Sequence, residues 1–106
     1  MAREKILVVD DDLHHLSKIY LALVHQRFKA EACNNPEEIP ARIKRFKPSV
    51  IILDSEEYYK INNKLRIPAI VMLAQQGPEY PLGYGDLSLK KPVTAEMLIK
   101  TVERLI

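Results

Sequence analysis

The sequence lacks several features that would point to a secreted or membrane-bound protein. It has a single cysteine, Cys33, so an internal disulfide is excluded and a reducing compartment is favoured. No apolar run approaches the roughly 18 residues that a membrane-spanning helix needs. The N-terminus has no signal-peptide core, because its short apolar run is followed at once by aspartate. We therefore expect a cytoplasmic location and no membrane partner.

An excess of positive charge is missing as well. The formal net charge is only +2, and acidic and basic residues are mixed along the chain. A nucleic-acid-binding surface needs Lys and Arg gathered on one face. The densest basic cluster, residues 44–47, is typical of the last turn of a helix, where cations interact favourably with the helix dipole. No nucleic-acid partner is therefore expected.

The length and the hydrophobic content predict one domain over residues 1–106. The chain has 106 residues, of which 47% are hydrophobic, enough for one core. Short apolar runs typical of strands alternate with segments that have helical spacing. Strands are expected at residues 5–9, 29–33, 49–54, 67–73 and 87–90. This alternation predicts an α/β doubly wound sheet of five parallel strands in the order 2-1-3-4-5, with the second strand at an edge.

Capping residues mark the helices between these strands. Asp11 or Asp12 can cap the first helix, Asn35 the second and Thr94 the last. Pro40 is expected to delay or kink the start of the second helix. The core-facing residues of the first helix are expected to be Leu13, Leu16, Tyr20, Leu23, Val24 and Phe28.

The later connections depart from this regular pattern. Residues 55–66 are expected to form only a short third helix. All three glycines and two prolines fall within residues 74–86, which argues against a normal fourth helix there. We expect an extended loop instead, carrying Tyr80 and Tyr84.

Acidic side chains follow two of the expected strands. The first strand ends in Asp10, Asp11 and Asp12, and the third ends in Asp54. In an open parallel sheet, ligands bind beyond the carboxyl ends of the strands, where the strand order reverses. Like charges held together there repel, and a divalent cation or a cationic side chain would relieve that repulsion. Lys91, after the last strand, is a candidate, and a helix cap explains only one of the three aspartates.

These segments give the chain a resemblance to the receiver domains of response regulators, over essentially its full length. The resemblance is carried by residues 5–12 (KILVVDDD), 47–54 (KPSVIILD), 67–71 (IPAIV) and 90–93 (KKPV). Each segment alone discriminates weakly, but together they occur in the order and spacing of that family. The resemblance implies a flavodoxin-like fold.

The resemblance also implies a function. Asp54 would be the phosphoacceptor, and Lys91 would contact a phosphoryl oxygen, with a cis bond to Pro92. The implied partners are a histidine kinase or phosphotransfer protein and an output protein or domain. The chain would not be an enzyme that turns over an external substrate.

A magnesium ion is the implied cofactor. Asp11, helped by Asp10, would hold Mg²⁺ together with Asp54 and the backbone carbonyl of Glu56. Magnesium takes oxygen ligands, which suits carboxylates at strand ends. The ion and an ammonium group would offset the repulsion between an anionic nucleophile and an anionic phosphoryl group.

Some positions depart from the family pattern. Leu73 stands where the family has Ser or Thr at the end of the fourth strand, and no Ser or Thr occurs between Ser55 and Ser88. Ser88 itself stands where the family has an aromatic residue. Residues 55–58 replace the usual Met-Pro-x-Met-x-Gly loop. These departures predict atypical output switching.

Two other functions fit parts of the sequence. A pseudo-receiver would use the same fold for protein interaction without phosphorylation. A phosphatase of the haloacid-dehalogenase class would explain Asp10-x-Asp12, but that class expects Thr or Val where His14 stands. We expect His14, His15 and His25 to face solvent rather than to bind metal.

Overall fold

The computed structural model describes residues 4–61, 66–74, 82 and 86–106. Its first half contains β1 (Lys5–Val9), α1 (Leu13–His25), β2 (Lys29–Cys33), the 3-10 helix η1 (Pro36–Glu38), α2 (Ile39–Phe46) and β3 (Val50–Asp54). Its second half contains α3 (Ser55–Ile61), β4 (Ala69–Leu73), β5 (Leu87–Lys90) and α4 (Ala95–Leu105). The predicted alternation of strands and helices is confirmed.

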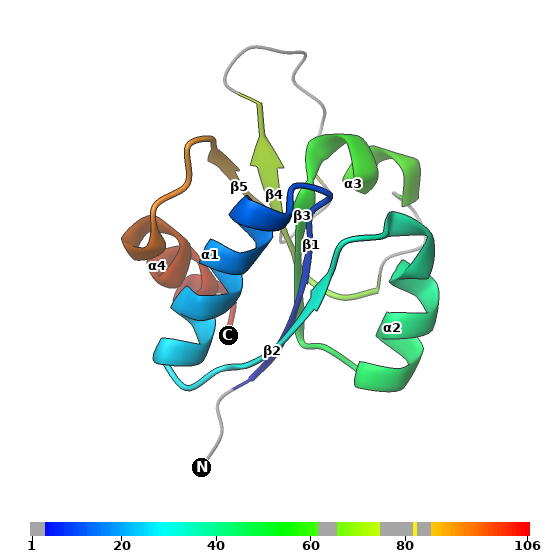
Figure 1. The fold of residues 1–106 in the computed structure, drawn as a ribbon, viewed down its shortest axis with the longest axis horizontal. Coiled ribbons are helices and arrows are strands. Elements are labelled where there is room, and N and C mark those ends of the chain that lie inside the picture. The colour runs from blue at the N-terminus through cyan, green and yellow to red at the C-terminus, as the bar shows by residue number, and fades with distance from the viewer. Residues whose placement is uncertain (1–3, 62–65, 75–81, 83–85) are drawn as a thin grey trace.

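The five strands form one parallel sheet in the order β2-β1-β3-β4-β5 (Figure 1). This is the predicted order, with β2 at one edge. Leu7 of β1 pairs with Ile51 of β3, and Leu53 of β3 pairs with Val71 of β4. Because all strands run the same way, their carboxyl ends share one edge of the sheet.

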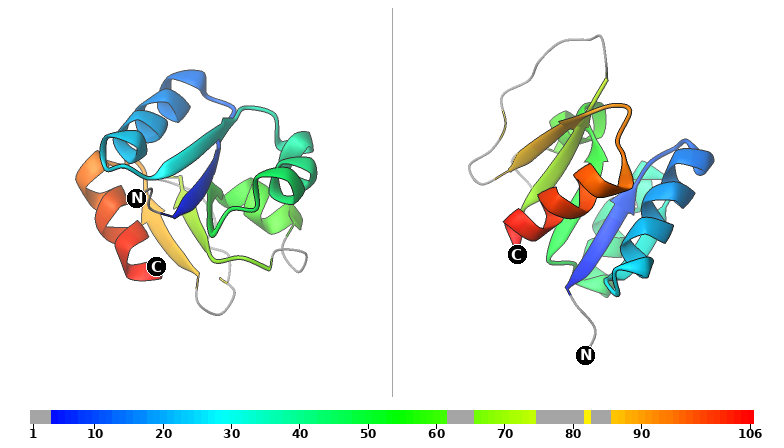
Figure 2. Two further views of the ribbon diagram at one scale, coloured as in Figure 1. Left: turned by 90° about the horizontal axis from the view of Figure 1, so that it is seen from below. Right: turned by 90° about the vertical axis from the view of Figure 1, so that its left-hand side faces the viewer.

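Helices cover both faces of the sheet, as the two views of Figure 2 show. Ile6 and Val8 belong to the core that includes residues of α1 and α4, whereas Leu7 and Val9 belong to the core that includes residues of α2 and α3. Successive strand residues point to opposite faces, so a strand covered on both sides is apolar throughout. This explains the uninterrupted apolar runs of β1 and β3.

The predicted helix caps are present. Asp12 accepts hydrogen bonds from the backbone N–H groups of His14 and His15, at 3.0 and 3.3 Å. Asn35 caps η1, and Thr94 caps α4. The α-helix α2 begins only after η1, with Pro40 in its first turn, where a missing backbone N–H has little cost. The expected delay at Pro40 is confirmed.

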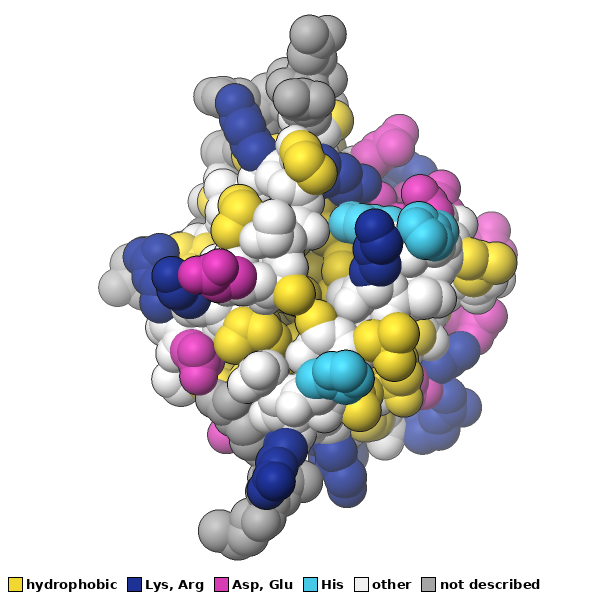
Figure 3. Space-filling view, turned by 60° about the vertical axis from the view of Figure 1, so that its left-hand side comes forward, with side chains coloured by type: hydrophobic (Ala, Val, Ile, Leu, Met, Phe, Trp, Pro, Cys, Tyr) yellow, Lys and Arg dark blue, Asp and Glu magenta, His cyan; other side chains and the backbone are white. Residues whose placement is uncertain are grey.

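The predicted core face of α1 was partly wrong. Leu13 and Val24 are 60% and 40% exposed, whereas Ile19, which was not expected in the core, is 4% exposed. The buried stripe is Leu16, Ile19 and Leu23. Leu16 and Leu23 were predicted correctly, but apolar residues occur on more than one side of this helix, so spacing alone did not separate Leu13 and Val24 from the buried stripe. Figure 3, in which the left-hand side of the Figure 1 view comes forward, shows hydrophobic and histidine side chains at the surface.

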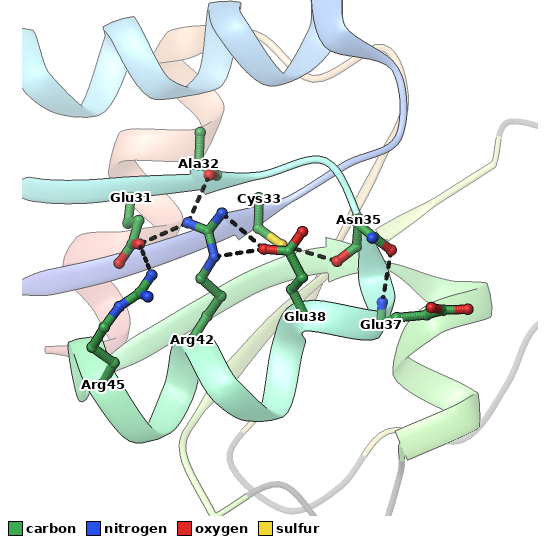
Figure 4. Close-up of polar contacts among 8 residues, drawn as sticks. All are labelled: Glu31, Ala32, Cys33, Asn35, Glu37, Glu38, Arg42 and Arg45. Atoms are coloured by element: carbon green, nitrogen blue, oxygen red, sulfur yellow. Dashed lines mark hydrogen bonds and ion pairs between the residues drawn. The ribbon is translucent and has the colours of Figure 1, made fainter.

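An arginine joins α2 to the edge strand β2 (Figure 4). Arg42 donates from Nη1 to Glu31 Oε1 at 2.7 Å and from Nη2 to Glu38 Oε1 at 3.1 Å. Arg45, in the last turn of α2 as predicted, donates to the same oxygen of Glu31 at 3.2 Å. These bonds fix α2 against β2.

The third helix is short, as expected, although residues 62–65 lie outside the described residues. The predicted loop 74–86 falls largely on residues 75–81 and 83–85, which also lie outside them, Tyr80 and Tyr84 included. Residues 74, 82 and 86 are described, and none of the three is helical. Within the described part of the chain, no helix has the length and apolar character to span a membrane.

Candidate functional site

Three carboxylates meet at the carboxyl edge of the sheet. Asp10 and Asp11 follow β1, and Asp54 is the last residue of β3, the strand that pairs with β1. One ligand oxygen from each side chain lies within 4.8 Å of the others. Among the described residues, this is the one group of His, Cys, Asp and Glu side chains arranged closely enough to hold a metal ion together. The structure therefore brings together the three side chains that were expected to bind Mg²⁺.

Asp10 is the most enclosed of the three. It is 2% exposed, and its Oδ1 accepts a hydrogen bond from the backbone N–H of Asp12 at 3.0 Å. Its Oδ2 contacts Nδ1 of His15. The expectation that His15 faces solvent was therefore wrong. The cap at Asp12 places residue 15 in the first turn of α1, where side chains point back toward the helix start.

Lys91 reaches the same group from the other side. Its backbone N–H donates to the carbonyl of Leu73 at 2.9 Å, which fixes the residue after β5 beside the end of β4. Its Nζ lies 2.7 Å from Oδ1 of Asp54. The Lys91–Pro92 bond is cis, as expected.

The charges at this edge do not balance. Burial raises the pKa of Asp54, and the nearby charges of Asp10 and Asp11 raise it further, while Lys91 opposes the shift. Burial alone would lower the pKa of Lys91, but its hydrogen bond to Asp54 and the three negative charges raise that pKa overall. Beside burial, both pKa values respond to the same charge distribution, in which three carboxylates face one ammonium group. A divalent cation would remove this excess.

A cavity of about 210 Å³ opens onto these side chains. Its walls include the three carboxylates and Lys91, together with Ser55 and Glu56 at the start of α3. The oxygen-only donor set fits a hard cation such as Mg²⁺, which keeps several waters when bound. Because α3 starts at Ser55, Glu56 lies in its first turn, where a carbonyl normally accepts a bond from the residue four places on. Use of this carbonyl as a ligand stays a prediction, for which the second lone pair of a carbonyl oxygen could serve.

Asp12 has a different role from its neighbours. Its carboxylate caps α1, and the hydrogen bonds from the backbone of His15 and His14 lower its pKa. It does not belong to the described carboxylate group. The structure thus explains Asp12 as a helix cap, which removes the feature that pointed to a phosphatase of the haloacid-dehalogenase class.

The two atypical positions lie apart from the cavity. Leu73 packs against the core on the α2 and α3 side and is not among the residues that line the cavity, whereas its neighbours Met72 and Ala74 are. Ser88 pairs with Val71 within the sheet and is exposed. Neither residue contributes to the cavity beside Asp54.

Comparison with known proteins identifies the fold. No protein-family model and no curated protein sequence matches the chain. A response regulator structure from Desulfuromonas acetoxidans matches with a TM-score of 0.78 at 21% identity, covering 97% of this chain and 96% of that one. A CheY-like response regulator receiver domain protein from Methanospirillum hungatei JF-1 matches with a TM-score of 0.77 at 21% identity, covering 98% and 94%. The corresponding values for a response regulator receiver protein from Burkholderia phymatum are 0.77, 21%, 97% and 94%.

The chain therefore has the fold of response-regulator receiver domains. The resemblance drawn from the sequence segments is confirmed at the level of fold. At 21% identity, the likeness to these structures shows the fold alone.

Burial and the excess of negative charge predict the direction in which the pKa of Asp54 departs from its ordinary value. In the metal-free protein, its carboxyl pKa should lie above the ordinary 3.8, and Lys91→Met should raise it further because the opposing ammonium is lost. Since the pKa rises on folding, this group's contribution to stability should decline as the pH increases through the folded-state pKa. The carboxyl carbon shift of Asp54, followed by NMR against pH, measures the midpoint. A midpoint at or below the ordinary value would contradict this account of the charges.

Proposed function

We propose that the chain is a signal-transduction receiver domain that accepts a phosphoryl group on Asp54 in a Mg²⁺-dependent reaction. The observation that carries this proposal is the contact of Lys91 Nζ with Asp54 Oδ1, at 2.7 Å, beside the carboxylate group. A structural ion pair would explain Asp54 and Lys91 alone. It leaves unexplained why two further carboxylates gather at the same strand edge.

In the proposed reaction, a carboxylate oxygen of Asp54 attacks the phosphorus of the donor. The bond between phosphorus and the donor's leaving group breaks, and that group departs with the bonding electrons, leaving an aspartyl phosphate. Lys91 holds the carboxylate in place and stabilises charge on a phosphoryl oxygen. Asp11 and Asp54, with Asp10, would hold Mg²⁺, whose contribution when bound is to neutralise negative charge. The proposed donor is a histidine kinase or a phosphotransfer protein.

A pseudo-receiver that binds partners without phosphorylation is the second candidate. The observation that favours it is the absence of a hydroxyl side chain at Leu73, which packs into the core instead. Because Leu73 has no hydroxyl, a phosphoryl group on Asp54 would have one hydrogen-bond donor fewer than in the family. The carboxylates and Lys91 keep their places nevertheless, so we prefer the phosphorylated form.

Incubation with acetyl phosphate and Mg²⁺ tests the proposal. Intact-mass measurement should show the addition of one phosphoryl group, and chelation of the metal should prevent it. Asp54→Asn should abolish the addition, and Asp10→Asn should weaken it. Lys91→Met should slow the reaction roughly 100-fold or more, because one charge-stabilising donor is lost.

Lys90→Met is the matched control, because Lys90 is the exposed neighbour of Lys91 and does not line the cavity. It should react at the rate of the unmodified chain. Phosphorylation that persists in Asp54→Asn would show that the acceptor is another residue. No addition to the unmodified chain would favour the pseudo-receiver.

We further propose that output differs from the usual receiver mechanism. In the family, a hydroxyl at the end of the fourth strand moves with the phosphoryl group, and an aromatic residue on the fifth strand follows it. Leu73 has no donor to offer and Ser88 has no ring, so neither provides a contact that distinguishes the two states. An equilibrium shifts only by the difference in interaction between its states.

Hydrogen bonds to Asp86 connect the helix after Asp54 with the two strands that follow it in the chain. Tyr58, in the helix that follows Asp54 directly, is 3% exposed and donates from its hydroxyl to Asp86 Oδ2 at 2.6 Å. The other oxygen of Asp86 accepts the backbone N–H of Ala69 at 2.9 Å. This link connects α3 with the start of β4 and with the residue before β5. We propose that it carries the response to phosphorylation.

Amide chemical shifts with and without beryllofluoride, a phosphoryl mimic, test the output proposal. Changes should concentrate in residues 55–60 and 74–86, with little change along β5 and α4. Tyr58→Phe should reduce the chemical-shift change at Asp86 and leave the changes near Asp54 as they are in the unmodified chain. Large changes along residues 88–90 and the last helix at saturating mimic would contradict the proposal.

A further inference from the structure

The contact between His15 and Asp10 is separate from the helix cap at Asp12 and from the ion pair of Lys91 with Asp54. The side chains of His15 and Asp10 are 20% and 1% exposed, and of the two residues Asp10 lines the cavity. Asp10 has protein partners on both oxygens, the N–H of Asp12 on Oδ1 and the imidazole Nδ1 on Oδ2. Asp10 is therefore held in one orientation, whereas Asp11 is exposed.

The local structure explains why this histidine, and not its neighbour, reaches Asp10. Asp12 caps α1, so His15 is the third residue of the helix, directed back over the end of β1. His14 is also in the first turn, but it is exposed, and the hydrogen bond that the structure shows for it comes from its backbone N–H. Of these two adjacent histidines, His15 contacts Asp10 with its side chain, whereas the side chain of His14 is exposed.

The imidazole is placed to act through Asp10 rather than on the cation. The group of described side chains whose ligand atoms share one centre comprises Asp10, Asp11 and Asp54, without His15. A carboxylate oxygen with one hydrogen-bond donor keeps a further lone pair for a metal or for a metal-bound water. Hydrogen bonds to a ligand side chain fix its orientation, and their loss typically weakens metal binding 10- to 100-fold.

We infer that His15 is a positioning residue for the cation site. Its Nδ1 holds Asp10 so that the remaining lone pairs of that carboxylate face the ion shared with Asp11 and Asp54. This inference rests on the proposed function, because it requires that the site bind a divalent cation. It adds a residue of α1 to a site otherwise built from residues at strand ends and at the start of α3.

Calorimetric titration of the full chain with Mg²⁺, and separately with Mn²⁺, tests the inference. His15→Leu should weaken the binding of both ions about 10-fold or more. His15→Asn should restore most of the affinity, because its side-chain N–H group can occupy the place of Nδ1. His14→Leu and His14→Asn are the matched controls and should bind like the unmodified chain. Thermal unfolding without metal establishes that each variant is folded.

The outcomes separate this inference from the function on which it rests. Failure of the unmodified chain to bind either ion would refute both. Equal affinities in the unmodified chain and His15→Leu would refute the inference alone, and so would tighter binding in His15→Leu, which would show that the imidazole competes with the cation. Loss of Mn²⁺ binding much greater than loss of Mg²⁺ binding, without rescue by His15→Asn, would show that His15 is itself a ligand and would also overturn the inference.

Discussion

The parallel pairing of β1 with β3 is the constraint on which the site depends. Two neighbouring strands that run the same way must end at the same edge, so the aspartates that follow them are held together whatever their mutual repulsion. Burial of both strands on both faces keeps them there, because moving either end would expose apolar core. The fold thus stores an excess of negative charge at one edge, and Lys91 offsets only part of it.

The surrounding elements have separate tasks in maintaining this arrangement. Asp12 and α1 provide the cap and the imidazole that hold Asp10. The backbone bond from Lys91 to Leu73 places the lysine beside β4 and within reach of Asp54. On the other side, Arg42 holds α2 to the edge strand. Asp54 itself lies at the end of β3, which pairs with β1 on one side and β4 on the other.

The sequence predicted the sheet and the acidic group for a clear physical reason. Strands buried on both faces must be apolar without interruption, so β1 and β3 were visible as runs, and each run stopped at aspartate. Parallel order then required those aspartates to meet. The caps at Asn35 and Thr94 were equally local and were predicted, and Asp12 was one of two candidates for the cap of the first helix.

What the sequence did not reveal depends on orientation in three dimensions. His15 was expected to face solvent. Its contact with Asp10 depends on which residue caps α1, and the sequence left that choice open between Asp11 and Asp12. The core stripe of α1 was predicted only in part, since Leu13 and Val24 are as apolar as the residues that pack. The sequence predicted a short helix within residues 55–66 but did not fix its start, which falls directly at Ser55 and places Glu56 within a helical turn. The Tyr58–Asp86 bond joins residues 28 positions apart, beyond the reach of any local pattern.

A crystal structure of the chain grown with Mg²⁺ and beryllofluoride would test the central claim most directly. The account predicts the beryllium bonded to a carboxylate oxygen of Asp54, a fluoride contacted by Lys91 Nζ, and Mg²⁺ coordinated by Asp11 and Asp54. Beryllofluoride at another residue, or a metal ion bound away from the group of Asp10, Asp11 and Asp54 in crystals that contain both, would contradict it.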